Sequence, residues 1–118
     1  MKTFEKTAAQ GEIRVRRIEK LPDYVIEEKP ADGVYIIGHS ETGHHHVLDA
    51  NPATKVYRAK NAPEGMRILY AILDEPTALI HKRSFDTHEP LLHAPGIYEY
   101  RLDREYDPYA ELARAVAD

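Results

Sequence analysis

The chain contains no cysteine. This absence excludes disulfide bridges and metal sites built on thiolates, so a bound metal would be held by histidine, aspartate or glutamate. A chain without cysteine also suits a reducing compartment, which favours a cytoplasmic location, or a virion if the protein is encoded by a phage.

Long apolar runs are missing as well. No segment approaches the roughly 18 apolar residues that a membrane helix needs, and no apolar segment follows the charged start, so neither a membrane span nor a secretion signal is expected. The formal net charge is −4, and the basic residues are scattered apart from Arg14, Arg16 and Arg17. Nucleic acid is therefore not an expected partner.

The composition is that of a globular protein: 118 residues, of which 42% are hydrophobic and 31% are charged. This length suits one domain with one core. Residues 1–11 are polar and follow neither the strand period nor the helix period. We therefore expect an N-terminal arm over residues 1–11, followed by a single β-rich domain over residues 12–118.

Short alternating or apolar segments between turns that contain proline or glycine indicate β-strands. The expected strands cover residues 12–16, 24–27, 34–37, 55–58, 66–73 and 97–102. Asp107 at an N-cap and Pro108 at the first helical position predict a helix, on which Tyr109, Leu112 and Val116 share one face. The fold class is therefore mostly β, a small β-barrel or sandwich with a short C-terminal helix.

Histidines are concentrated in one segment, which reads Gly38-His39-Ser40-Glu41-Thr42-Gly43-His44-His45-His46. If residues 44–46 are extended, His44 and His46 project from the same face about 7 Å apart, and His45 points away. Two imidazoles in this arrangement can bind one ion. We therefore predict a divalent metal site, with zinc as the leading candidate ahead of iron, nickel and manganese.

Further ligands for this site are available in the sequence. His39 and Glu41 lie before the Gly43 turn, and a later group contains His81, His88 and His93. Two other interpretations stay open, namely a solvated histidine-rich loop and histidines that act in catalysis without a metal. Taken alone, His81 or His93 also fits the description of an interior or surface residue whose hydrogen bonds are satisfied without a metal.

The spacing from Gly38 to the pair His44 and His46 resembles the first motif of the cupin family. The resemblance implies a β-barrel that holds a metal with two histidines, a glutamate and a later histidine. This chain has Ala50 and Asn51 where a cupin has its glutamate, and its Pro95-Gly96 follows His88 and His93. The likeness therefore covers the nine positions 38–46, and it implies only a barrel that bears a paired-histidine site.

Other segments resemble small uncharacterised bacterial and prophage-type proteins. This second likeness spans most of the chain and brings no established activity. It is carried by the segments Gln10-Gly11-Glu12-Ile13, Glu41-Thr42-Gly43-His44 with His46, His88-Glu89-Pro90-Leu91, Pro95-Gly96-Ile97-Tyr98 and Arg104-Glu105-Tyr106-Asp107-Pro108.

Two functional hypotheses follow. The first is a non-enzymatic assembly or binding module, such as a virion or prophage structural protein that decorates a capsid. Its partners would be copies of itself or a larger protein assembly, and its histidine segment would hold a metal or stabilise an interface. The second is a small cupin-like metalloenzyme, in which His44, His46 and His88 bind the metal and Glu41 acts as general base on a metal-bound water.

Overall fold

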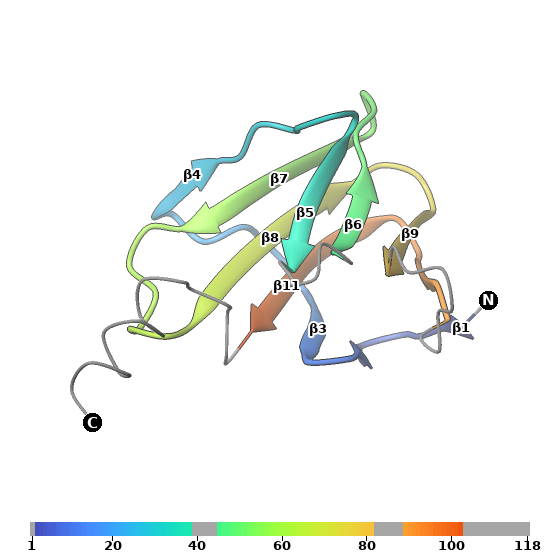
Figure 1. Cartoon of the computed structure of the whole chain (residues 1–118), viewed down its shortest axis with the longest axis horizontal. Coiled ribbons are helices and arrows are strands. Elements are labelled where there is room, and N and C mark those ends of the chain that lie inside the picture. Colours follow the sequence, from blue (N-terminus) through green and yellow to red (C-terminus); the bar gives the residue numbers. More distant parts are fainter. Residues whose placement is uncertain (1, 39–44, 82–88, 103–118) are drawn as a thin grey trace.

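The computed structural model describes residues 2–38, 45–81 and 89–102, and these residues form two β-sheets (Figure 1). The large sheet has six strands in the order β2-β3-β11-β8-β7-β4, and every neighbouring pair is antiparallel. Its strands are β2 (Thr7–Gln10), β3 (Ile13–Ile18), β11 (Gly96–Leu102), β8 (Arg67–Leu73), β7 (Thr54–Ala59) and β4 (Val25–Glu27).

The small sheet has five strands in the order β1-β10-β9-β6-β5. Its first pair is parallel and the others are antiparallel. Its strands are β1 (Lys2–Thr3), β10 (Leu91–His93), β9 (Thr77–His81), β6 (His46–Asp49) and β5 (Val34–Gly38).

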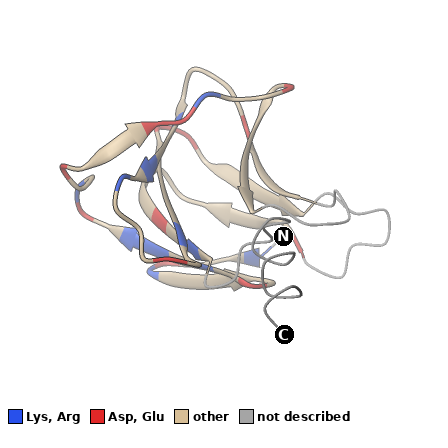
Figure 2. Cartoon of the chain, turned by 60° about the vertical axis from the view of Figure 1, so that its left-hand side comes forward, with Lys and Arg blue, Asp and Glu red and all other residues tan. Residues whose placement is uncertain are grey.

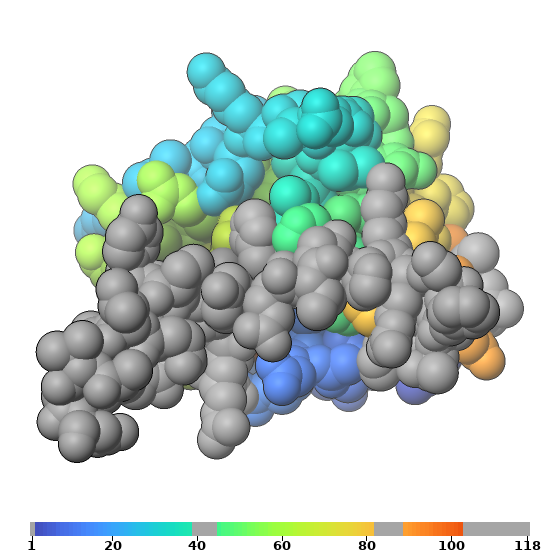
Figure 3. All heavy atoms as spheres, in the orientation of Figure 1, coloured from blue at the N-terminus to red at the C-terminus, as the bar shows by residue number. Residues whose placement is uncertain are grey.

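The two sheets stack as a sandwich-like fold. In Figure 1 the hairpin of β5 and β6 crosses in front of β8 and β11 of the large sheet. The space-filling view shows this hairpin and β4 in the upper part of the same face, with the N-terminal strands at its lower edge (Figure 3). The expected β fold is thus confirmed as a sandwich, and the barrel alternative is wrong because the two sheets keep separate edges.

The core lies between the sheets and follows the alternation of the strands. Leu69, Ala71 and Leu73 of β8 point inward beside Tyr98 and Tyr100 of β11, and all five belong to one buried cluster. Side chains of the small sheet cover them from the other side, among them Ile37, Leu48, Leu79 and Leu91. Burial of these apolar side chains is the main stabilising contribution that the sequence pattern encodes.

Each expected strand corresponds to a strand of the structure, but five strands were not among those expected. They are β1, β2, β6, β9 and β10. The first two lie in residues 2–10, which the sequence indicated as an arm without strand periodicity. Ladder bonds need only backbone N–H and C=O groups, so the polar segment of β2 can pair with β3.

The expected helix after Asp107 lies outside the described residues. Within the ranges that the structure describes, no helix is long and apolar enough to cross a membrane.

His93 is a fully buried histidine inside the core. Its Nδ1–H donates to the Leu91 carbonyl at 3.0 Å, so Nε2 accepts a hydrogen bond from the Tyr100 hydroxyl at 2.8 Å. The rings of Phe4 and Tyr98 also make T-shaped contacts with its ring, with centroids 5.0 and 4.6 Å away. Burial disfavours the charged imidazolium and lowers the pKa of His93 to about 4, against the opposing effect of its backbone hydrogen bonds.

His93 therefore makes the free energy of unfolding depend on pH. Its pKa is lower in the folded chain than the ordinary 6.5, so the unfolded chain binds the proton first and stability falls as the pH drops from 6.5 to 4. We expect this group to remove up to about 3 kcal/mol between pH 7 and pH 4. Urea unfolding at pH 7, 5 and 4 measures this loss.

The control is His93→Gln, which keeps a polar side chain next to Tyr100 and does not titrate. The other six histidines are common to both proteins, so the difference between the two pH profiles isolates His93. Parallel profiles for the two proteins would contradict the prediction.

Candidate metal site

Two histidines of the small sheet lie side by side where β6 begins and β9 ends. His46 and His81 are register partners of the antiparallel pair β6 and β9. Their rings are stacked, with centroids 4.2 Å apart and an angle of 10° between the planes. His81 is 9% exposed and His46 is half-buried. We call these two residues the histidine pair.

Gln10 of β2 fixes the orientation of one ring. Its Nε2 group donates to the Leu79 carbonyl and to the Glu89 carbonyl, each at 2.9 Å. With both amide hydrogens used, its Oε1 atom accepts the hydrogen bond from His46 Nδ1 at 2.8 Å. In neutral His46 the proton therefore lies on Nδ1, and the lone pair lies on Nε2.

Gly38 of β5 lies opposite the same histidine and close to two side chains of the large sheet. It is the register partner of His46, next to an irregularity in the ladder of β5 and β6. A Cβ atom at this position would lie 2.8 Å from Cδ1 of Ile13, 3.1 Å from Cδ2 of Leu102 and 3.4 Å from Cδ2 of His46. A side chain at this position would require the end of the buried Ile13 side chain to shift, so glycine fits without displacing the core.

The structure brings together two of the histidines that the sequence singles out as ligands, His46 and His81. His39, Glu41, His44 and His88 lie outside the described residues, so their roles stay predictions. His93 is separate from the histidine pair, because its two ring nitrogens bond to Leu91 and Tyr100 in the core. The interpretation of His93 as a satisfied interior residue is confirmed.

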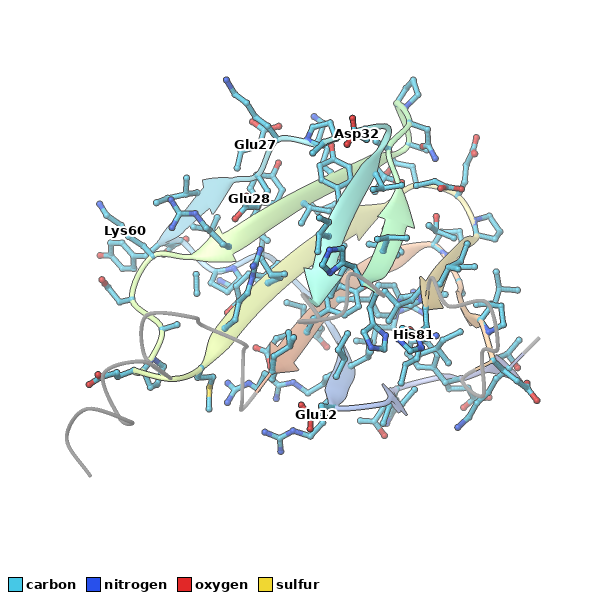
Figure 4. The ribbon with its side chains drawn as sticks, in the orientation of Figure 1. Glu12, Glu27, Glu28, Asp32, Lys60 and His81 are labelled. Carbon is cyan, nitrogen blue, oxygen red and sulfur yellow. The ribbon has the colours of Figure 1, made fainter. Side chains whose placement is uncertain are left out.

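Acidic side chains of the described strands do not complete the site. In Figure 4 the labelled residues Glu27, Glu28 and Asp32 lie along the upper edge of the molecule, away from His81. Among the residues that the structure describes, no three histidine, aspartate or glutamate side chains are grouped closely enough to hold a metal ion. Within this part of the chain the candidate site is the histidine pair with its support from Gln10.

Two surface grooves lie elsewhere on the molecule. The larger one, of about 660 Å³, is lined by Lys6, Thr7, Arg16, Arg17, Ile18, Glu19, Gly96 and Ile97. The smaller one, of about 210 Å³, is lined by residues of β5, β7 and β8 and of the loop before β5. Neither groove is lined by a member of the histidine pair.

Comparison with known families gives one match. A family model described as "Domain of unknown function (DUF8820)" matches residues 9–103. The chain belongs to the DUF8820 family. This confirms the expectation of a small uncharacterised family, and the match carries no link to cupins or to prophage proteins. No curated protein and no solved structure matches the chain.

The DUF8820 match contains Gln10, Gly38 and both members of the histidine pair. Sequence reasoning missed the part played by Gln10, because this residue stands in a polar segment and its partners are far away along the chain. The only sequence signal was its position in one of the segments that resemble uncharacterised proteins. Its contacts depend on strands from both sheets meeting at one place.

Replacing Gln10 by leucine tests its bridging role in the DUF8820 domain. Gln10→Leu leaves the carbonyls of Leu79 and Glu89 and the Nδ1–H group of His46 without this partner. We expect the free energy of unfolding to fall by about 2–4 kcal/mol, since polar groups that lose a buried partner cost about 1–3 kcal/mol each and relax in part. Equilibrium denaturation measures the loss.

The matched control for this substitution is Ala9→Leu, which adds a similar side chain to the neighbouring exposed position of the same strand. It should change stability by less than about 1 kcal/mol. Equal losses for the two variants would show that the strand, and not the amide, is responsible.

Proposed function

We propose that this DUF8820 domain is a non-enzymatic binding module that holds a divalent cation, most readily zinc, at the histidine pair. The observation that carries this proposal is the hydrogen bond from His46 Nδ1 to Gln10, combined with the position of His81 as the register partner of His46. Metal-bound histidines usually donate their second N–H group to an oxygen acceptor in this way. His46 is thus held in the tautomer that offers Nε2 to a metal.

The spacing and the orientation of the two rings define what metal binding requires of them. Tetrahedral zinc binds nitrogen at about 2.0–2.1 Å, which places two ligand nitrogens about 3.3 Å apart. The ring centroids of the histidine pair are separated by 4.2 Å. In the stacked arrangement the ring planes are parallel and the nitrogen lone pairs do not converge, so binding of one ion by both residues requires the His81 side chain to turn into another rotamer.

The remaining coordination positions are proposed for water and for the histidines and carboxylate that the sequence predicts. His44 precedes His46 by two residues, and His88 follows His81 by seven. His39 and Glu41 lie in the same histidine segment. In this proposal Glu41 is a ligand candidate, and its role as a general base belongs to the enzymatic alternative.

Assembly is the second part of the proposal. Among the described residues, the large hydrophobic side chains that are exposed are Tyr24, at 75%, and Ile26, at 37%. Ile26 lies on β4, which is an edge strand of the large sheet, and Tyr24 is the residue before this strand. Edge strands offer unpaired backbone groups to another chain. This favours partners that are copies of this chain or a larger protein assembly. The proposed location is the cytoplasm, or a virion if the protein is encoded by a phage.

Zinc titration of the protein without an affinity tag tests the metal part. We expect one zinc ion per chain by isothermal titration calorimetry, and a rise in Tm when zinc is added, because a ligand that binds the folded state stabilises it. His46→Ala and His81→Ala should each weaken zinc binding at least about tenfold, since each removes one ligand.

The matched control is His45→Ala, which removes a histidine next to the pair and leaves the pair intact. Its zinc affinity should equal that of the unmodified chain. Absence of zinc binding, or equal losses for all three variants, would contradict the proposal. Measuring mass in solution with and without zinc then shows whether the metal also controls assembly.

A further inference from the structure

Strand β4 leaves one side of its backbone open. Within the described ranges it pairs with β7 alone. At its two ends, the Glu28 N–H group donates to a carbonyl of β7 at 2.8 Å, and the Tyr24 carbonyl accepts from the residue after β7 at 3.1 Å. An antiparallel pair directs the backbone groups of every second residue to the partner strand. Tyr24, Ile26 and Glu28 therefore face β7, and the N–H and C=O groups of Val25 and Glu27 face the open side.

The exposed large hydrophobic side chains of the described residues lie at this open strand. They are Tyr24 and Ile26, which are two residues apart and so share one face of the strand. The other edge strand of the large sheet, β2, differs, because its exposed residues are Thr7 and Ala9, whose side chains are small. Natural proteins avoid an open backbone edge with exposed apolar side chains unless it has a partner. The edge of β4 is therefore suited to pairing with another strand.

We propose that β4 pairs antiparallel with β4 of a second copy of this chain, about a twofold axis at Ile26. This inference rests on the assembly part of the proposed function and names its partner. Val25 of each copy exchanges both backbone hydrogen bonds with Glu27 of the other copy, and the large sheet continues from one chain into the next. The same surface is used by both copies, so the assembly closes as a dimer.

This register brings the exposed apolar side chains together. Ile26 lies opposite Ile26 of the second copy, in a pair without hydrogen bonds between its members, where Cα atoms are about 4.5 Å apart. Tyr24 lies diagonally from Ile26 of the second copy, at about 7–8 Å, a distance that an aromatic side chain bridges. Directly opposite Tyr24 is Glu28 of the second copy, whose carboxylate is 3.3 Å from Arg58 of its own chain. No unpaired charge therefore enters the apolar contact.

Charge selects this register over the neighbouring ones. Centred on Ile26, the pairing places Asp23 opposite Lys29 of the second copy and places no like charges opposite each other. A shift that preserves the hydrogen bonds moves one strand by two residues. Centred on Val25, the pairing would place Asp23 opposite Glu27, and centred on Glu27 it would place two glutamates opposite each other, which is destabilising. Figure 2 shows acidic positions on both sides of the uncharged part of β4 and a basic position beyond them.

Cysteine cross-linking of the full chain tests the register, because the protein has no cysteine of its own. Ile26→Cys should form a disulfide between two chains rapidly under mild oxidation, since residues opposite each other lie within the Cα separation of about 4.4–6.8 Å that disulfides span. Tyr24→Cys is the matched control. It lies on the same face and is more exposed, but its two copies are offset by four residues, about 13 Å. We expect this control to cross-link at least about tenfold more slowly.

Sedimentation equilibrium measures the association itself. Asp23→Lys and Lys29→Asp should each weaken the dimer at least about threefold, because each places like charges opposite each other twice, and the two substitutions together should restore it. Ile26→Lys should abolish the dimer. Ala9→Lys should leave it intact, because this substitution places the same charge on an exposed position of β2, the other edge strand.

The outcomes separate this inference from the proposed function. Equal cross-linking rates for the two cysteine variants, or a dimer that persists in Ile26→Lys, would overturn the pairing of β4 and leave assembly through another surface. A chain that stays monomeric up to about 1 mM, with and without zinc, would overturn both the pairing and the assembly part of the proposed function. Zinc titration tests the metal part independently of either outcome.

Discussion

The side-chain amide of Gln10 links the two sheets at the place where the candidate site is built. It projects from β2 of the large sheet and bonds to β9, to the segment before β10 and to His46 on β6. A buried amide must satisfy its donors and its acceptor within the protein. These three bonds therefore fix how the end of one sheet lies against the other, and they also fix which nitrogen of His46 carries its proton.

The described histidines of the small sheet differ because their surroundings differ. His93 is buried among Phe4, Tyr98 and Tyr100, and both its nitrogens are bonded within the core, so it acts as a neutral packing residue. His46 and His81 stack on each other near the end of the sheet. One residue type thus serves the core in one strand and a candidate ligand site in two others. Desolvation and hydrogen-bond partners decide which role each takes.

The two faces of the large sheet differ less in polarity than the two faces of a sheet in an ordinary two-layer sandwich. Its inner face carries the aromatic and aliphatic core, and its outer face carries Ile68, Tyr70 and a carboxylate held between two arginines. The buried carboxylate is acceptable because Arg16 and Arg101 supply hydrogen bonds and compensating charge.

The sequence by itself determined the mostly β fold and the strands with clear alternation, such as β3 and β11. Alternation and turn residues act over a few neighbours, so a local pattern is enough to encode them. The polar strands β1 and β2 escaped prediction because backbone pairing with a distant strand, and not side-chain periodicity, makes them strands. Only the tertiary structure decided that His46 meets His81 and that Gln10 orients His46, because these contacts join residues that are neighbours in register and not in sequence.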